Sequence, residues 1–269
     1  MKCSLRRVSD ALHSRGVRFH PMREKPIRTE ADERDRLAFA KKYAQKPARF
    51  WADSVHAYMD NKSFPVFLNS AGRSWAAKRA ARGTYRAKGQ GLAQGHVKPR
   101  SAQKVNFGKS VMMAVALSAK KVLMCHVVPG KWNASEAAKM YSKSLAPALQ
   151  DMYPSKRRYQ ILEDNDPSGY KSKAAIQAKD ECKIVPMGFP KRSPDINPLD
   201  YGFWSHVNRL LRKQESAFPA SKRETRCQFI ARVKRTVKRV PASVLTPLVK
   251  SMKRRCVALR NAKGKDFEE

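Results

Sequence analysis

The stretch YQILEDNDPSGYKSKAAIQAKDECKIVPMGFPKRSPDINPLDYGFW, residues 159–204, carries the pattern that decides the fold. It begins with a short apolar run at 159–162, which predicts a buried strand, and a segment with helical spacing follows at 171–180. A second apolar run at 183–186 predicts another strand, and Pro198 stands near the start of a further helix. Strands that alternate with helices indicate a sheet that is covered by helices.

Three more strand signals lie upstream of this stretch. Apolar runs predict strands at 54–59, 111–117 and 121–128, with a tight turn between the last two, and a helix is expected at 134–152. A three-stranded meander followed by alternating helices and strands is a mixed α/β sheet, in the element order of ribonuclease H-like nuclease domains. We therefore expect an α/β fold of this kind with flanking helices.

Helices are also expected towards both ends of the chain. Ser4 is placed to cap a short helix, and Thr29 opens a longer one, with Asp32 at the position where a capping box has Glu or Gln. Two basic helical segments are expected at 222–240 and 245–259.

The charge of the chain indicates a polyanionic partner. Its 269 residues include 57 Lys and Arg but only 22 Asp and Glu, which gives a net charge of +35. Repulsion at this level destabilises a compact chain unless a counter-charge screens it, and nucleic acid is the expected source of that charge. Because 42% of the residues are hydrophobic, a sizeable core is still possible.

Cysteine usage and hydropathy limit the cellular setting. The five cysteines are scattered and form no C-x-x-C pair, which argues against a structural zinc site and suits a reducing compartment. The first residues lack the apolar core of a signal peptide, and the longest apolar stretch, near 111–119, is too short to span a bilayer. We expect no membrane partner.

A long acid-free segment follows the first strand. No Asp or Glu occurs from Asn61 to Ser135, and residues 69–109 contain ten Lys or Arg and six Gly. Burying such unpaired charges would be costly, so we predict a basic arm that projects from the sheet and contacts DNA or a second protomer. A loop without any role is the alternative. The candidate DNA contacts in the arm are Arg79, Arg82, Arg86 and Lys88.

A second basic surface is predicted on the helix near the C-terminus. Residues 221–240 carry eight Lys or Arg against one Glu, while an apolar stripe of the same helix is expected to pack in the core. The stripe consists of Phe229, Val233, Val237 and Val240. The candidate DNA contacts here are Arg232, Lys234, Arg235 and Lys238.

Three of the scarce carboxylates stand where side chains can converge. Asp60 is expected to end the first strand, Asp164 follows the fourth, and Asp200 lies in the first turn of a helix. Such a cluster offers the hard oxygen ligands that Mg²⁺ and Mn²⁺ prefer, and it can hold two ions about 3.5–4 Å apart. Any one of these aspartates alone would more often be a helix cap or a surface residue, so the surrounding motifs decide.

Those motifs resemble the mariner-like transposases of the DDE/DDD superfamily. ILEDNDP at 161–167 resembles the family's second-aspartate motif, KRSPDINPLDYGFW at 191–204 the third-carboxylate motif, and HAYMDNKSF at 56–64 the first-aspartate strand. Residues 33–51 are similar to the linker helix that enters the catalytic domain, and residues 248–264 to the closing helix. The interval between the second and third aspartates is also close to that of the family.

The resemblance implies a DNA transposase that cleaves and joins DNA strands with two Mg²⁺ or Mn²⁺ ions. Asp60, Asp164 and Asp200 would be the catalytic residues and the metal ligands, with Asp60 and Asp164 sharing one ion. Asn165 and Asn197 are expected to shape the loops. Transposon ends and target DNA would be the partners, on which the chain would form a homodimer or a higher assembly. The implied location is the nucleus in a eukaryote, and otherwise the cytoplasm or nucleoid.

The same resemblance predicts three regions. Residues 1–48 would be the remnant of a helix-turn-helix region and linker, 49–215 the catalytic domain with its basic insertion at 68–109, and 216–269 a basic helical region. Because family members carry two helix-turn-helix modules ahead of the catalytic domain, the chain is expected to be truncated at its N-terminus.

Three positions depart from the family pattern. Glu163 replaces the usual Gln or His and is expected to add an anion beside the metal site, Gly169 stands where His is frequent, and Asp200 replaces Glu, as in the mariner branch. An inactive or domesticated DNA-binding relative is therefore the alternative function. A structural ribonucleoprotein component is a third, against which the SPDINPLDYGFW motif argues.

Overall fold

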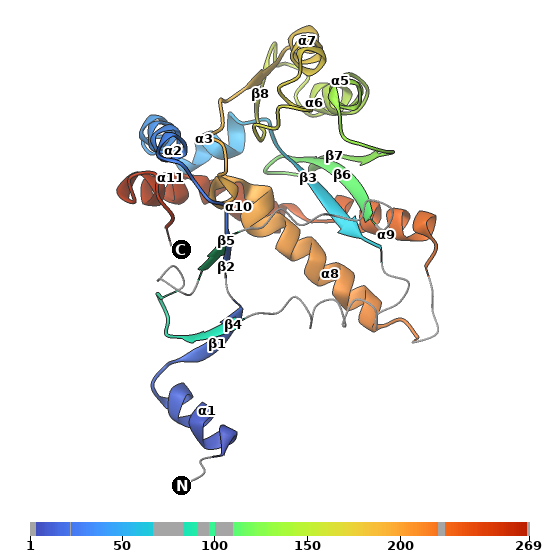
Figure 1. The fold of residues 1–269 in the computed structure, drawn as a ribbon. Coiled ribbons are helices and arrows are strands. Elements are labelled where there is room, and N and C mark those ends of the chain that lie inside the picture. Colours follow the sequence, from blue (N-terminus) through green and yellow to red (C-terminus); the bar gives the residue numbers. More distant parts are fainter. Residues whose placement is uncertain are drawn as a thin grey trace.

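A five-stranded mixed sheet forms the centre of the protein (Figure 1). The computed structural model describes residues 4–21, 23–66, 83–90, 97–99, 110–219 and 224–267. The strand order is β7-β6-β3-β8-β9, where β7, β6 and β3 are antiparallel neighbours and β8 and β9 run parallel to β3. The strands are β3 (Ala57–Pro65), β6 (Ser110–Leu117), β7 (Val122–Val128), β8 (Tyr159–Leu162) and β9 (Ile184–Pro186). The mixed sheet predicted from the sequence is thereby confirmed.

The first strand of the sheet differs from its prediction. It was expected at 54–59, ending before Asp60, but β3 starts at Ala57 and continues to Pro65. The reason is its pairing with β6, which extends from Tyr58 opposite Leu117 through the polar residues that follow Asp60. Asp60 therefore lies inside a strand, held by ladder hydrogen bonds on one side, and not at a strand end.

Helices cover both faces of the sheet and give the protein three layers (Figure 1). The alternation along β3 separates the two cores, since Tyr58 and Phe64 pack on one side while Ala57 and Met59 pack on the other. The first face is covered by α2 (Glu30–Tyr43), α3 (Ala48–Asp53), α8 (Trp204–Ser216), α9 (Arg226–Lys238), α10 (Ala242–Lys250) and α11 (Met252–Asn261). The second is covered by α5 (Ala134–Met140), η2 (Tyr141–Leu145), α6 (Ala146–Met152) and α7 (Lys173–Glu181).

Most of the predicted helices are present with small shifts of their ends. Thr29 caps α2 and forms the expected capping box with Asp32, whose carboxylate accepts hydrogen bonds from the Thr29 backbone and hydroxyl. The apolar stripe of α9 is buried as predicted. Short α3 was not predicted.

The helix that follows Pro198 begins with a wide π-helical turn, η4 (Leu199–Phe203), after a 3-10 turn, η3 (Pro194–Ile196). The buried residues of this helix recur at every fourth position, at Leu199, Phe203, Val207 and Leu211.

The described parts of the basic arm pair with the N-terminal region. α1 (Leu5–Ser14) precedes β1 (Arg18–Pro21) and β2 (Arg23–Lys25), which had not been predicted as strands; β1 pairs with β4 (Gly83–Arg86) and β2 with β5 (Val97–Pro99). α1 and the β1–β4 pair lie away from the five-stranded sheet (Figure 1). The candidates Arg79 and Arg82 lie outside the described residues.

The other two arm candidates differ from each other. Arg86 is buried, at 8% exposure, whereas Lys88 is exposed. Of the two, only Lys88 presents its charge to solvent.

The C-terminal helices belong to the same core as the sheet. α9 packs on β7, α10 on α3, and α11 on α2. In the part of the chain that the structure describes, no helix combines the length and apolar character needed to cross a membrane.

Candidate active site

Strand register places two of the predicted aspartates side by side. β3 and β8 run in parallel with Tyr58 opposite Leu162. Asp60 and Asp164 each follow two positions later, so they are expected at the same height and on the same face of the sheet. Asp200 comes from η4, whose following residue Trp204 begins α8.

The charges of the three carboxylates interact at this edge. Burial raises the pKa of Asp60 well above its ordinary value, and the negative charges of Asp200 and, more weakly, Asp164 raise it further. The indole Nε1 of Trp204 donates a hydrogen bond of 2.6 Å to Asp60 Oδ2, which opposes the shift. Asp200 and Asp164 thus lie close enough to Asp60 to affect its charge, while joint ligation of a metal ion by the three residues stays a prediction.

The ligand types at this edge fit a divalent cation. The donor set consists of carboxylate oxygens, the class that Mg²⁺ and Mn²⁺ prefer, and the repulsion that raises the pKa of Asp60 is one that a cation would relieve. Among the described residues, however, no three His, Cys, Asp or Glu side chains are grouped closely enough to hold a metal ion. Asp164 and Asp200 are both exposed, and the three carboxylates would have to lie closer together for joint ligation.

Two asparagines hold the loops that carry the carboxylates, as the sequence predicted. The buried Asn197 donates from its amide to the carbonyl of Met59, next to Asp60, at 3.5 Å, and its backbone carbonyl accepts from the Asp200 amide at 3.0 Å. The amide of Asn165 donates to the carbonyl of Phe189. Neither side chain is used as a ligand in these contacts.

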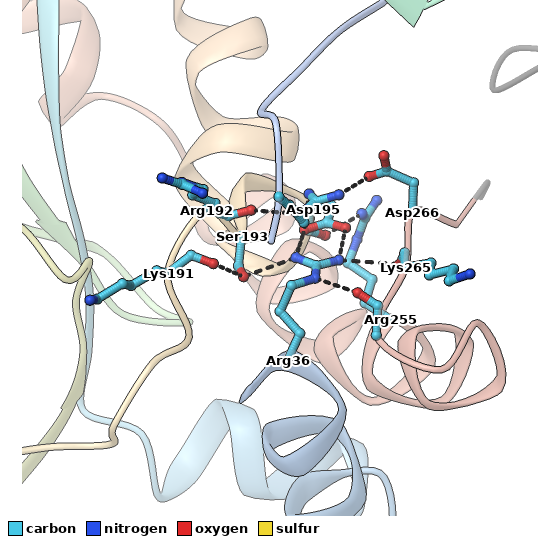
Figure 2. Close-up of polar contacts among 10 residues, drawn as sticks. Arg36, Lys191, Arg192, Ser193, Asp195, Arg255, Lys265 and Asp266 are labelled. Atoms are coloured by element: carbon cyan, nitrogen blue, oxygen red, sulfur yellow. Dashed lines mark hydrogen bonds and ion pairs between the residues drawn. The ribbon is translucent and has the colours of Figure 1, made fainter. Parts of the chain in front are cut away.

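A buried arginine fixes the segment in front of Asp200 (Figure 2). Arg36 of α2 has no exposed surface, and its guanidinium donates to both carboxylate oxygens of Asp195, at 2.7 and 2.6 Å, and to Ser193 Oγ at 2.9 Å. Its Nε donates to the carbonyl of Gly264 at 2.7 Å. Arg36 therefore joins the linker helix, the Ser-Pro-Asp loop and the segment after α11, and we call these contacts the Arg36 hub.

The hub continues to neighbouring charges. Arg28 donates to Asp266 at 2.5 Å, and Arg255 donates to the backbone carbonyl of Asp195 at 2.8 Å while lying 3.6 Å above the Tyr201 ring. Gly264 has a φ of +86°, and a Cβ there would lie 2.1 Å from the carbonyl oxygen of Glu33 in α2. Only glycine allows both this backbone conformation and this close approach.

Glu163 does not add an anion beside the aspartates, contrary to the expectation from the sequence. It precedes Asp164 on an extended segment, so its side chain points to the opposite face, where it is 3% exposed. There Lys179 Nζ donates to Glu163 at 2.5 Å and the Tyr141 hydroxyl also donates to it. Burial raises the pKa of Glu163, and the charge of Lys179 opposes that shift.

We predict that Glu163→Gln lowers stability. Gln keeps a hydrogen-bond acceptor but leaves the buried Lys179 ammonium without its counter-charge, which we expect to cost about 1–3 kcal/mol in the free energy of unfolding. Urea denaturation followed by circular dichroism measures this. The control is Asp151→Asn, which removes one partner of the exposed Lys121–Asp151 pair and should change the free energy by less than about 1 kcal/mol. Equal effects of the two substitutions would contradict the assignment.

One predicted DNA contact on α9 has a structural role instead. Arg232 is held between Glu215, at 2.9 Å, and Glu224, at 2.5 Å, and its guanidinium lies 5.4 Å from the centre of the Phe229 ring. The pattern of residues 221–240 does not predict this contact, because Glu215 belongs to another helix. Arg235 and Lys238 are exposed and Lys234 is half-buried, so these three remain candidates for phosphate contact.

A cavity of about 740 Å³ opens beside the carboxylates. Asp60 and Asp164 line one part of it, and residues of the loop after β7, including Trp132, line another. Reasoning from the sequence did not single out Trp132.

Comparisons with known proteins agree with this site and fold. No family model matches the chain. The Tc1 transposable-element transposase of Caenorhabditis elegans is 24% identical over 262 residues, which are 97% of this chain and 86% of that protein. The Tc3 transposase of the same organism is 26% identical over 164 residues, or 59% of this chain and 46% of that protein.

Solved structures of the Mos1 mariner transposase share the fold. A pre-cleavage Mos1 transpososome has a TM-score of 0.67 and 18% identity, and the match covers 98% of this chain and 72% of that one. The Mos1 catalytic domain has a TM-score of 0.64 and 16% identity over 91% of this chain and 99% of that one, and Mos1 has been solved with Mn and with Mg. The ribonuclease H-like fold and the resemblance to mariner-like transposases, both predicted from the motifs, are confirmed.

Proposed function

We propose that this chain, a relative of the Tc1/mariner transposases, is a DNA transposase that cleaves DNA strands and joins them to a target. The observation that carries the proposal is the match to a transposase over nearly the whole length of the chain. The influence of the charges of Asp200 and Asp164 on the pKa of Asp60 supports it. The net charge of +35 supports a polyanionic substrate.

We propose a separate role for each residue of the site. Asp60 and Asp164 would hold one divalent cation and Asp200 would help to hold a second, for which Mg²⁺ and Mn²⁺ are the candidates. Trp204 orients Asp60 through its indole hydrogen bond, and Asn197 ties the Asp200 turn to β3. The bound cations would supply activation of a water or 3′-hydroxyl nucleophile and stabilisation of the leaving oxygen.

The assembly on DNA and the cellular location are part of the same proposal. The Mos1 structures include paired-end complexes, and we propose that this chain also acts as a homodimer or higher assembly on transposon ends, in the nucleus if its host has one. The region boundaries at 49 and 215 and the projecting basic arm remain predictions.

Cleavage of supercoiled plasmid DNA by the full chain tests the proposal. Mg²⁺ or Mn²⁺ should support nicking, whereas Ca²⁺ should bind without supporting turnover and chelation should abolish the reaction. DNA binding without nicking under any of these metals would instead support the alternative, an inactive or domesticated DNA-binding relative. The observation that favours this alternative is that, among the described residues, no three acidic, His or Cys side chains are grouped closely enough to hold a metal ion.

Exposed charges on α9 should contribute to DNA affinity. Each phosphate neutralised on duplex DNA adds about −0.9 to the slope of log affinity against log salt, so Arg235→Ala with Lys238→Ala should make this slope shallower by about two units. Fluorescence anisotropy with a labelled duplex, measured over a range of salt concentrations, gives the slope. The melting temperature should not change, because both side chains are exposed.

Arg232→Ala provides the contrast. It removes the partner of Glu215 and Glu224, so it should lower the melting temperature and leave the salt slope nearly unchanged. If the slope of the double variant equals that of the wild type, α9 makes no phosphate contact.

A further inference from the structure

The cavity beside the carboxylates has two chemically different walls. Asp60 and Asp164 form an acidic part, and Lys131 and Arg226 add positive charge at the same cavity. The rest of the lining contains polar side chains, among them Asn61 and Ser63, and a group of apolar and aromatic side chains. This apolar wall consists of Met112, Val128, Pro129, Trp132 and Tyr170. A sugar–phosphate backbone would leave such a wall unused, but a planar apolar ligand would fill it.

Trp132 is held rigidly in that wall. Its indole Nε1 donates to Asp166 Oδ2 at 2.7 Å, and its ring meets Tyr170 edge-on, with centroids 5.2 Å apart and an interplanar angle of 68°. Asp166 is itself fixed, since it accepts from the backbone amides of Ser168 and Gly169 at 3.2 and 2.9 Å. Because the polar atom of the half-buried indole is already used, the ring offers apolar surface to the cavity.

Gly169 makes room for this arrangement. A Cβ at position 169 would lie 1.9 Å from the Trp132 Nε1 atom and 2.4 Å from its Cε2 atom. The indole therefore occupies the space that a side chain at 169 would need. Gly169 stands where mariner-like transposases often have His, so an aromatic ring from a different loop takes that place here.

We infer that Trp132 and the apolar wall form a subsite for a single unstacked nucleobase, belonging to the DNA strand whose phosphate lies at Asp60 and Asp164. The inference rests on the proposed function. The subsite opens from the carboxylates, so a nucleotide next to the reacting phosphate lies within its reach. A base inside an intact duplex cannot enter, and enzymes that use such pockets take the base out of the stack and hold it against aromatic side chains.

A binding experiment with the full chain in Ca²⁺ tests this inference. The probe is a hairpin duplex with a two-nucleotide single-stranded 3′ end that carries either 2-aminopurine or an abasic site. Stacking of one base on an aromatic ring corresponds to about 5- to 150-fold in affinity, so the wild type should bind the 2-aminopurine end more tightly by a factor in that range. Contact with the indole should also quench the 2-aminopurine fluorescence.

Three variants separate stacking from packing. Trp132→Leu keeps an apolar side chain but removes the aromatic face, so it should lose most of the preference for the base and most of the quenching. Trp132→Phe should restore part of the preference. Ile176→Ala, at an exposed position on α7 outside the cavity, should behave like the wild type.

Equal affinity of the wild type for the two probes would overturn the inference, and this comparison needs no variant to fold. Equal weakening of both probes in Trp132→Leu would overturn it as well, because Trp132 would then only support Tyr170. The proposed function fails separately: a preserved base preference together with no nicking in Mg²⁺ or Mn²⁺ refutes the transposase activity and leaves the subsite standing.

Discussion

Asp164→Asn should abolish the metal-dependent nicking of plasmid DNA while leaving DNA affinity unchanged or higher. The substitution keeps the size of the side chain but removes the anionic oxygen that we propose as a metal ligand, at the sheet edge beside Asp60. Stabilisation of charge by a catalytic metal ion is worth several kcal/mol, so the rate should fall by about 10³-fold or more. Affinity should not fall, because the variant has lost a negative charge that repels phosphate.

The rate is measured with supercoiled plasmid in Mn²⁺ and the affinity by anisotropy in Ca²⁺. Asp151→Asn is the matched control, since it removes an exposed carboxylate that does not line the cavity, and it should nick at the rate of the wild type. Undiminished nicking by Asp164→Asn would show that the activity arises at another site or from another protein.

Arg36→Met should produce the largest loss of stability of any single substitution considered. The change removes every hydrogen bond of the Arg36 hub and leaves the carboxylate of Asp195, 6% exposed, without its bidentate partner. Breaking a buried ion pair by removing one partner costs about 3–5 kcal/mol, and the counter-charge that would remain for Asp195, Arg28 at 3.8 Å, is too distant for a hydrogen bond. Equilibrium unfolding in urea measures the change.

Arg192→Met is the control for this experiment. Arg192 also pairs with a carboxylate, Asp32, at 2.7 Å, but its side chain is 48% exposed. Exposed ion pairs contribute about 0–1 kcal/mol, so the two arginines should differ several-fold in their effect. A loss for Arg36→Met no larger than that for Arg192→Met would mean that the hub is not a stabilising centre.

Local sequence signals were sufficient for most of the sheet. The apolar runs that predicted β6, β7 and β8 are short segments in which apolar side chains are buried or half-buried. The end of β3 was wrong because its polar residues are kept extended by β6, a partner that the local pattern does not contain. For the same reason, β1 and β2 were missed, since each pairs with a short strand of the arm.

The candidate site was predicted from sequence motifs that resemble a known family, and less from the physical properties of its residues. Asp60, Asp164 and Asp200 were identified from the sequence motifs that surround them. The alternation of side chains along a strand could also have placed Glu163 on the opposite face of the sheet. The contacts between distant positions could not be read in this way. Arg36 and Asp195 are 159 positions apart, and Trp132 and Asp166 are 34 apart, so neither pair leaves a periodic or local trace.

The Arg36 hub also has a consequence for the order of events during translation. Arg36 leaves the ribosome early, but its backbone acceptor at Gly264 follows 228 positions later. Before Gly264 is synthesised, the Arg36 guanidinium, which is buried in the folded protein, lacks one of its hydrogen-bond acceptors. We therefore expect α2 to dock only after the segment that follows α11 has left the ribosome. Contacts so distant in sequence slow folding and prolong the exposure of apolar surface. Ribosome-bound chains stalled before Gly264 should therefore be cut by protease within α2, a segment that the released protein protects.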